Sequence, residues 1–315
     1  MTYIGIDVGG SYIKYGVVNR KGQLLFSDKQ STDRSNPQAV VQTIVAISSL
    51  LQQRYEIKGI GISIPGVINH ENRLITSGAI VGLHEIEVSQ LLARQTGKPI
   101  VLVNDANAIG YGEQWVGNGK NCQNFVCLPL GTGVGGAIIV NGQLLKGRTG
   151  AAGEFGMALM GLGKTEPVAY ESASLYCGAV AGLCRIYSTK LGKPNAADWT
   201  VDIPHILKLA EEGDQKATES LGEFYQNTAV LLLNIAVTID PEKILIGGGV
   251  SDSPIIMAGI EKAVKQLLAR YTVIENLGFP QLSRVKLGNT AGMIGAVSQL
   301  IERNESDGKN GKIYR

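Results

Sequence analysis

The sequence has 315 residues, long for a single hydrophobic core, so two domains with a cleft between them are expected. Its 29 basic and 27 acidic residues are interspersed and give a net charge of +2, which argues against a nucleic-acid-binding surface and favours a small diffusing partner. The sequence begins directly in "MTYIGIDVGG", without the pattern of a leader peptide, and no apolar run reaches the length of a membrane span. We therefore expect a cytoplasmic protein that does not contact a membrane.

The first hundred or so residues predict three strands followed by an alternation of helix and strand. Two apolar runs joined at residues 9–11 form a predicted hairpin, and Pro37 lies near the start of the first helical pattern, a position that suits proline. The predicted strands are the hairpin over 2–19, then 22–32, 57–65 and 99–106, and the predicted helices are 36–54 and 86–97.

A second unit of the same plan begins at "NFVCLPLGTGVGGAIIVNGQLLKG", residues 124–147, where two apolar runs again flank a glycine-rich turn and a third strand follows. Helical patterns then fill roughly 168–238, a buried strand covers 243–250, and a helix over 291–302 precedes a loosely held tail at 303–315. The four cysteines match no zinc spacing and are expected to be buried thiols: Cys122, Cys127, Cys177 and Cys184.

The repeated plan predicts two facing α/β domains that hold a ligand at the ends of their strands. The predicted N-terminal domain comprises residues 1–115 and 290–310, and the predicted C-terminal domain comprises 116–289.

Glycine-rich turns follow three of the predicted strands. In the first, Asp7 ends a strand before Gly9 and Gly10, and in the second, Thr132 lies in "GTGVGG", residues 131–136. Backbone N–H groups in such turns bind phosphate, and a carboxylate beside them helps to hold the accompanying magnesium. An ordinary hairpin turn would explain either segment alone, but two at corresponding positions favour a pair of phosphate-facing loops. The third, "IGGGVSDSP", would admit a flat ring or ribose, and it has neither Rossmann nor P-loop spacing.

Two further segments carry candidate polar groups. Asn104 and Asp105 end an apolar strand and open a helix, where a partly desolvated carboxylate could accept a proton from a hydroxyl. N-capping of the helix is the structural alternative for this pair. Glu154 is the only carboxylate in "GAAGEFGMALMGLGK", and it is either a ligand contact or a solvated turn residue.

Together these segments resemble the ROK (repressor, open reading frame, kinase) family of sugar kinases, over nearly the whole chain. The resemblance lies in "IGIDVGGSYIKYGVV", "GISIPGVIN", "VNDANAIGYGE", "LGTGVGGAIIVNGQLLKG", "AGEFG" and "ILIGGGVS", which occur in the family's order. It implies the actin/hexokinase-like (ribonuclease H-like) two-domain ATPase fold, and the transfer of the ATP γ-phosphoryl group to a hexose hydroxyl, with the 6-hydroxyl as the expected acceptor.

The same resemblance implies roles for individual residues. Asp105 would be the general base, Asn104 and Glu154 would contact the sugar, and Asp7 would act near Mg²⁺. The residues implied to line the path of ATP are Asp7, Gly9, Gly10, Ser11, Lys14, Gly131, Thr132, Gly133, Gly248 and Gly249. Further sugar contacts are assigned to Gly78 and Ala79, and to Glu171 in "YESAS", for which a helix first-turn glutamate is the alternative.

One position departs from the family pattern. Met157 stands where the typical member has a zinc-binding histidine, and "MALMGLGKTEPVAYESAS" lacks the family's cysteine-rich run. Because tetrahedral zinc needs four ligands, no zinc is expected, and the chain is similar to the zinc-free branch that includes β-glucoside kinases and some hexose or N-acetylmannosamine kinases. A homodimer is implied by the family.

A function of another class is a sugar-sensing regulator without catalytic activity. Regulators of this family carry an N-terminal DNA-binding domain, whereas here the first phosphate segment begins at Tyr3. The presence of Asp7, Asp105 and both glycine turns favours the kinase.

Overall fold

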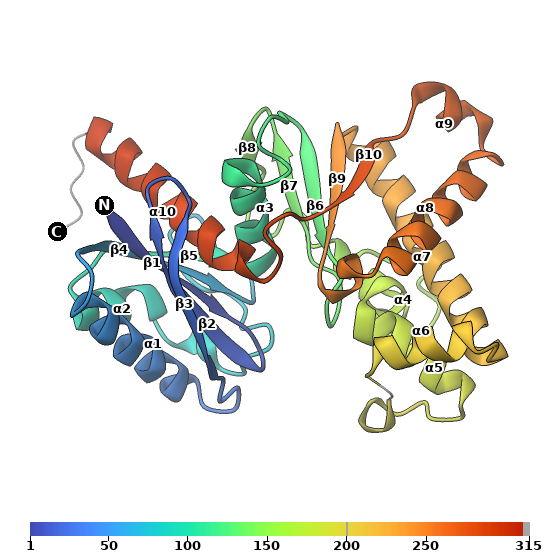
Figure 1. Ribbon diagram of the computed structural model, residues 1–315, viewed down its shortest axis with the longest axis horizontal. Coiled ribbons are helices and arrows are strands. Elements are labelled where there is room, and N and C mark those ends of the chain that lie inside the picture. Colours follow the sequence, from blue (N-terminus) through green and yellow to red (C-terminus); the bar gives the residue numbers. More distant parts are fainter. Residues whose placement is uncertain (200, 311–315) are drawn as a thin grey trace. The chain divides into compact units, whose positions relative to one another are not determined.

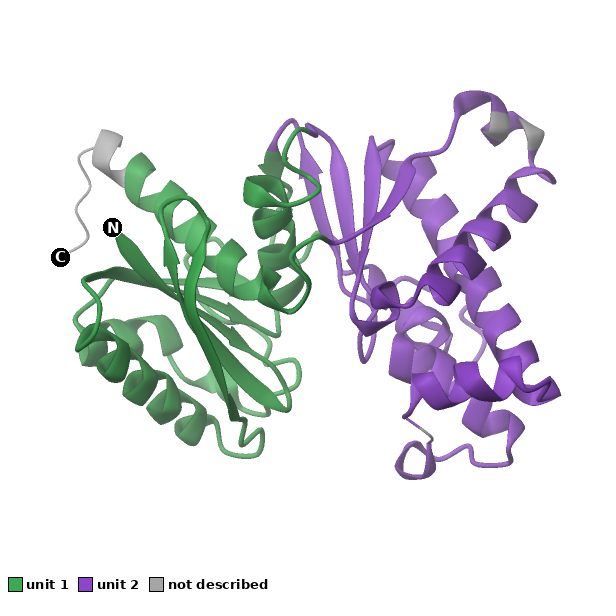
Figure 2. Ribbon diagram, in the orientation of Figure 1, with its two compact units in different colours: residues 1–121, 143–152, 286–315 green, residues 122–142, 153–285 purple. Residues whose placement is uncertain are grey.

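The computed structural model describes residues 1–199 and 201–310, including their side chains except those of 272, 275 and 307–310. Contacts divide the chain into two compact units, shown in Figure 2. The first comprises residues 1–121, 143–152 and 286–315, and the second comprises residues 122–142 and 153–285. The predicted C-terminal domain included residues 143–152, whereas this segment belongs to the first unit, where a Cβ on Gly150 would collide with the carbonyl of Ile68.

The first unit is built on a five-stranded sheet of order β3-β2-β1-β4-β5, seen in Figure 1. Its strands are β1 (Thr2–Val8), β2 (Tyr12–Asn19), β3 (Leu24–Ser31), β4 (Ile57–Ile64) and β5 (Ile100–Asn104). Its helices are α1 (Pro37–Gln52), the 3₁₀ turn η1 (Leu83–Glu85), α2 (Val88–Thr96), α3 (Asp105–Val116), the 3₁₀ turn η7 (Gly288–Thr290) and α10 (Ala291–Asn310). These elements confirm the predicted strands and helices of this half.

Helices cover both faces of this sheet, so its strands are apolar on both sides. On one face, Ile6, Ile62 and Leu102 pack in one core with side chains of α1 and α2. On the other face, Val101 and Val103 pack with residues of α3 and α10. The parallel strands β1, β4 and β5 end at one edge of the sheet, where the segments that follow them begin.

The second sheet has the order β10-β9-β6-β7-β8. Its strands are β6 (Phe125–Pro129), β7 (Ala137–Val140), β8 (Gln143–Leu144), β9 (Lys243–Gly247) and β10 (Gln281–Arg284). Between and beyond them lie the 3₁₀ turns η2 (Phe155–Met157), η3 (Val168–Glu171), η5 (Ala196–Asp198) and η6 (Gly249–Asp252), the π-helix η4 (Ala179–Cys184), and helices α4 (Ala173–Cys177), α5 (Arg185–Lys190), α6 (Ile203–Glu211), α7 (Gln215–Ile239), α8 (Pro254–Leu268) and α9 (Thr272–Leu277). One apolar core joins β6 and β9 to α4, α7 and α8.

Both sheets have the same strand order, which confirms the predicted repeat as topology. If the five strands of each sheet are counted in chain order, the second sheet read from β8 runs third, second, first, fourth and fifth, as the first sheet does from β3. In each, the first two strands are antiparallel, and the later strands pair in parallel. The turns 9–11 and 131–136 therefore occupy equivalent hairpins.

Two features differ from the sequence analysis. The predicted loose tail is wrong for residues 303–310, because α10 continues to Asn310 and Glu305 pairs with Arg20 of the β2–β3 turn. Residues 311–315 of that predicted tail lie outside the described residues. The sequence analysis also assigned nothing to α8, although Ser253 and Pro254 are a typical helix start and the Ser253 side chain caps it.

The four cysteines are buried thiols, as predicted. Within the described part of the chain, no helix is long and apolar enough to cross a membrane.

Candidate active site

Asp7 lies near the C-terminal end of β1, at the edge of the first sheet where the parallel strands end, and it contacts three neighbouring segments. It pairs in register with Lys14 on β2 and with Ser63 on β4. The Ser63 hydroxyl donates to Asp7 Oδ1 at 2.8 Å, and Lys14 Nζ lies 3.5 Å from Oδ2. A Cβ on Gly292 would lie 2.5 Å from Oδ1, so glycine allows the positive N-terminal end of α10 to approach this carboxylate.

The structure separates the two roles that the sequence left open for Asn104 and Asp105. Asn104 is buried and is the N-cap of α3: its Oδ1 accepts from the N–H of Asn107 at 3.0 Å, and its Nδ2 donates to the carbonyl of Gly66 at 3.0 Å. Asp105 is exposed in the first turn, where its Oδ1 accepts from the N–H of Ala106. Capping therefore belongs to Asn104, and the Asp105 carboxylate stands at the edge of the sheet.

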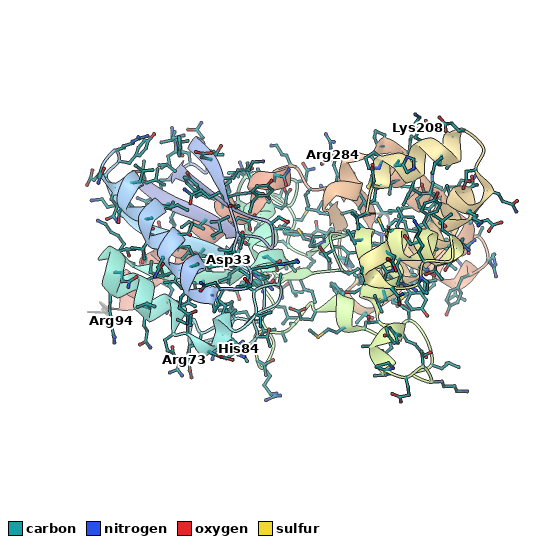
Figure 3. All side chains as sticks on the ribbon, turned by 90° about the horizontal axis from the view of Figure 1, so that it is seen from below. Asp33, Arg73, His84, Arg94, Lys208 and Arg284 are labelled. Carbon is teal, nitrogen blue, oxygen red and sulfur yellow. The ribbon has the colours of Figure 1, made fainter. Side chains whose placement is uncertain are left out.

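The segment between β4 and α2 borders this edge. Gly66 has φ +116°, and a Cβ there would collide with the carbonyl of Thr76, so the chain can turn in this way only with glycine. A Cβ on Gly10 would lie 3.6 Å from that of Ala79, which places the predicted sugar loop beside the β1–β2 turn. His84, labelled in Figure 3, fixes the same loop, since its ring and its N–H both bond to Ser77 Oγ.

The β1–β2 turn is itself held by β3. The N–H of Gly9 donates to the carbonyl of Tyr12, the hydroxyl of Thr32 donates to the carbonyl of Gly9, and the N–H of Thr32 donates to the carbonyl of Ser11. The first unit thus brings together Asp7, Gly9, Gly10, Ser11, Lys14, Gly78, Ala79, Asn104 and Asp105 at or next to one sheet edge.

The second unit holds the other predicted residues. In the β6–β7 turn, the carbonyls of Gly131 and Thr132 accept from N–H groups of η4, and Ser174 Oγ accepts from the N–H of Val134. Gly248 follows β9 with φ +81°, and a Cβ there would collide with the carbonyl of Leu130, so the two glycine turns are packed together. A Cβ on Gly131 or on Gly249 would meet nothing within 4 Å, so backbone at both positions faces open space.

Glu154 lines a cavity of about 450 Å³ in the second unit. The cavity is also lined by Ser172 and Ser174 and, on its outer side, by the exposed side chains of Met157, Leu159 and Val168. Burial raises the pKa of the Glu154 carboxyl above its ordinary value. Among the described residues the carboxylate has no hydrogen-bond or ion-pair partner, so it is available as an acceptor for a ligand.

Glu171 has a different environment. Its side chain is buried, its Oε2 accepts from the N–H of Gly163 at 2.6 Å, and its Oε1 accepts from the N–H groups of Lys164 at 2.9 Å and Thr165 at 2.7 Å. A hydrogen bond from the Thr165 side chain, followed by the bonds from the backbone N–H groups, holds the pKa of Glu171 below its ordinary value. Glu171 is the last residue of the short 3₁₀ turn η3 and lies within its first turn, as the alternative role expects. Its contact with a sugar stays a prediction.

Replacement of Glu171 by alanine should loosen the loop 161–165. Hydrogen bonds to a charged group each contribute about 1.5–3 kcal/mol, and three N–H donors would lose their acceptor. Because local cleavage follows the population of the open loop, we expect trypsin to cut after Lys164 at least about tenfold faster in Glu171→Ala. Glu166→Ala, an exposed change nearby, serves as the control. Equal cleavage of both variants would contradict the role of Glu171.

The stability that the bonds of Glu171 give to the loop 161–165 should depend on pH. Since the folded-state pKa of Glu171 is lowered, the stabilisation is complete above the ordinary pKa of glutamate and is lost as the pH falls through the lowered value.

Among the residues that the structure describes, no group of three or more His, Cys, Asp or Glu side chains could hold a metal ion. Asp7 can offer one carboxylate, already bonded to Ser63, so its surroundings suit Mg²⁺ that keeps most of its waters and is held mainly by phosphate oxygens. Met157 is exposed at the rim of the Glu154 cavity.

Sequence reasoning missed residues that support the site. Ser63 could have been found from its register opposite Asp7, since both face the same side of adjacent strands. Ser174, which holds the β6–β7 turn, and Glu113, which is buried in α3, have no sequence signal of their own, because their partners are distant backbone groups.

The two repeated sheets and their glycine turns define an α/β protein of the actin/hexokinase-like ATPase fold. Residues 3–303 match the model of the ROK family, so the chain belongs to this family. It is 34% identical to a β-glucoside kinase of Klebsiella pneumoniae, covering 94% of this chain and 95% of that protein. It is 30% identical to a β-glucoside kinase of Listeria monocytogenes, covering 96% and 98%. A ROK glucokinase of Streptomyces griseus, solved with glucose and AMPPNP, has a TM-score of 0.78 and 27% identity, covering 95% and 99%.

Proposed function

We propose that this chain is an ATP-dependent sugar kinase that transfers the γ-phosphoryl group of ATP to a hydroxyl, with the 6-hydroxyl as the expected acceptor, of a hexose or hexose derivative. The observation that carries the proposal is the exposed Asp105 carboxylate directly after β5, at the sheet edge that also holds Asp7 and adjoins the turn 9–11. The kinases among its relatives support it.

In the first unit, Asp105 accepts the proton of the attacking hydroxyl. Asn104 positions the start of α3 and offers the remaining capacity of its carboxamide to a sugar hydroxyl, and Gly78 and Ala79 approach the ring through backbone. Phosphoryl transfer through a loose transition state depends mainly on positioning and charge stabilisation, so rigid attachment of these residues to strand ends and caps suits the reaction.

In the second unit, the turn containing Gly131, Thr132 and Gly133 contacts the phosphates of ATP, and Gly248 and Gly249 border the adenosine. The open space at Gly131 and Gly249 supports this assignment, because backbone there can approach a ligand without side-chain obstruction. Glu154 accepts hydrogen bonds from sugar hydroxyls.

Gly9, Gly10 and Ser11 line the phosphate path in the first unit. Lys14 and Asp7 lie beside them, and Asp7 would help to hold Mg²⁺. When bound, Mg²⁺ neutralises the charge that develops on the phosphate oxygens.

The substrate that we favour is a glucoside with an apolar aglycone. Met157, Leu159 and Val168, which we call the apolar rim, are exposed beside Glu154, and large exposed apolar side chains gathered at a cavity are typical of ligand-binding surfaces. The two β-glucoside kinases among the relatives support this choice. Glucose and N-acetylmannosamine are the alternative substrates. The homodimer, the cytoplasmic location and the absence of zinc stay predictions.

The test measures ADP release with phenyl β-glucoside, glucose, N-acetylmannosamine, fructose or no sugar. We expect turnover only with sugar, and the highest kcat/KM with phenyl β-glucoside. In Met157→Ser, loss of apolar contact should raise the KM for phenyl β-glucoside up to about tenfold while the KM for glucose stays within about twofold. Absent or sugar-independent ADP release would contradict the kinase, and equal shifts for both sugars would contradict the role of the rim.

A further inference from the structure

A second cavity lies wholly within the first unit, between the β5 edge, α3, the loop 144–150 and the later part of α10. Its volume is about 290 Å³, near the lower end of the range for small-molecule sites. Its polar lining includes Lys146, His70, Asn107, Glu302 and Arg303. Of the residues proposed above for catalysis, ATP binding or sugar binding, only Asn104 is among the described residues of its lining.

The charged groups at this cavity favour an anion. Lys146 comes from the loop after β8, and Glu302 and Arg303 come from α10, while His70 has its Nε2 bonded to the carbonyl of Gly147. Two basic side chains and one carboxylate are thus among the described residues that line the cavity. Burial, and then the positive charge of Arg303, lower the pKa of Lys146 against the opposing effect of Glu302, and a bound anion would relieve this repulsion.

Asn107 is the second observation that points to a ligand. Its side chain lines the cavity and is 8% exposed, yet its carboxamide has no hydrogen bond to any residue that the structure describes, and its Oδ1 is buried without a partner. Buried amides are nearly always bonded, so this carboxamide is available to hydrogen-bond a molecule that enters the cavity. Rotation of the carboxamide could turn either its oxygen or its NH₂ group toward the cavity.

The other asparagines of the lining already have partners in the chain. Asn69 accepts from the N–H groups of Glu71 and Arg73, and Asn72 bonds the carbonyl of Ile100 and the N–H of Leu102. These bonds hold the loop 68–72 along the edge of β5 and fix one wall of the cavity. The cavity is therefore bounded by hydrogen-bonded loop residues, and its described lining includes one unbonded amide and the two basic side chains of Lys146 and Arg303.

We infer that this cavity is a binding site for a small phosphate-bearing molecule, whose phosphate lies between Lys146 and Arg303 and whose remaining polar atoms reach Asn107. Primary ammonium and guanidinium groups bind phosphate through charge-assisted hydrogen bonds. The two sources of this chemistry are inorganic phosphate and a phosphorylated sugar. The inference does not depend on the proposed kinase activity, since it concerns binding alone.

The experiment is calorimetric titration of the full chain with inorganic phosphate and, separately, with glucose 6-phosphate. Lys146→Gln should weaken binding of the preferred probe about 10- to 100-fold, because one charge-assisted bond is lost. Arg148→Gln makes a similar change of charge two residues away, outside the cavity lining, and should bind within about twofold of the unaltered chain. Tighter binding of glucose 6-phosphate would identify a sugar phosphate as occupant, and equal binding would identify phosphate itself.

Asn107→Asp provides a second variant, since a carboxylate there would repel the anion, and thermal unfolding verifies that both variants are folded. The inference is overturned if neither probe binds, if Lys146→Gln binds as the unaltered chain does, or if Arg148→Gln weakens binding equally. ADP release by the unaltered chain is measured separately, so the proposed phosphate site and the proposed kinase activity can each be rejected without the other.

Discussion

Asp105→Asn is expected to lower kcat about 10²- to 10⁴-fold, the usual contribution of a general base. The amide has nearly the same shape and can still accept from the N–H of Ala106, but it cannot take up the proton of the attacking hydroxyl. Because Asn104 rather than Asp105 caps α3, the fold should be kept. Loss of the charge in the first turn should cost at most about 1 kcal/mol.

Steady-state kinetics with ATP and the best sugar of the panel measure the change in kcat, and thermal unfolding measures whether the fold is kept. Asp198→Asn makes the same chemical change at an exposed position in η5 and should leave kcat unaltered. If Asp105→Asn kept most of its turnover, or if it lost activity only by unfolding, the assignment of the base would be wrong.

Glu113→Ala is expected to destabilise the first unit by about 3 kcal/mol or more. Glu113 is fully buried in α3, where its Oε1 accepts from the N–H groups of Lys286 and Leu287 at 2.8 Å and its Oε2 accepts from that of Asn118 at 2.7 Å. Each buried donor left without a partner costs about 1–3 kcal/mol. Since typical domains have only about 5–15 kcal/mol of stability, this loss is large.

Denaturant unfolding, monitored by the fluorescence of Trp115 on the same helix, gives the free energy. Glu71→Ala, an exposed change in the same unit, should alter it by less than about 1 kcal/mol. The free energy of unfolding of Glu113→Gln should lie between those of Glu113→Ala and Glu71→Ala. Its side-chain carbonyl can accept from the N–H groups of Lys286 and Leu287, while its NH₂ group faces the N–H of Asn118, another donor. A stability of Glu113→Ala equal to that of Glu71→Ala would show that the buried bonds contribute little.

Strands and turns were predictable where the pattern is local. The apolar runs on either side of residues 9–11 and 131–136 identified both hairpins, and their repetition predicted two units of one plan, which agrees with the common strand order. Helix α8 was overlooked despite its Ser253 and Pro254 start. The helical state of 303–310 was mispredicted because polar composition indicated a loose tail, whereas Glu305 of α10 pairs with Arg20, far away in sequence.

The candidate site was predictable in part, through the spacing of its motifs. Asn104 and Asp105 look alike as helix-start residues, and only the backbone geometry assigns the cap to one and exposure to the other. The use of Glu171 by the loop 161–165 could not be predicted, because its partners are backbone N–H groups that carry no side-chain signal. The cavity at Asn107 could not be predicted either, because its lining comes from four segments that are far apart in sequence.

³¹P NMR of a reaction with ATP, Mg²⁺ and phenyl β-glucoside follows the phosphoryl group from ATP to the sugar hydroxyl. We expect a growing phosphomonoester signal on the sugar, in step with ADP and absent without sugar. Growth of inorganic phosphate alone would mean ATP hydrolysis, and unchanged ATP across the whole sugar panel would mean no kinase; either result would overturn the proposed phosphoryl transfer.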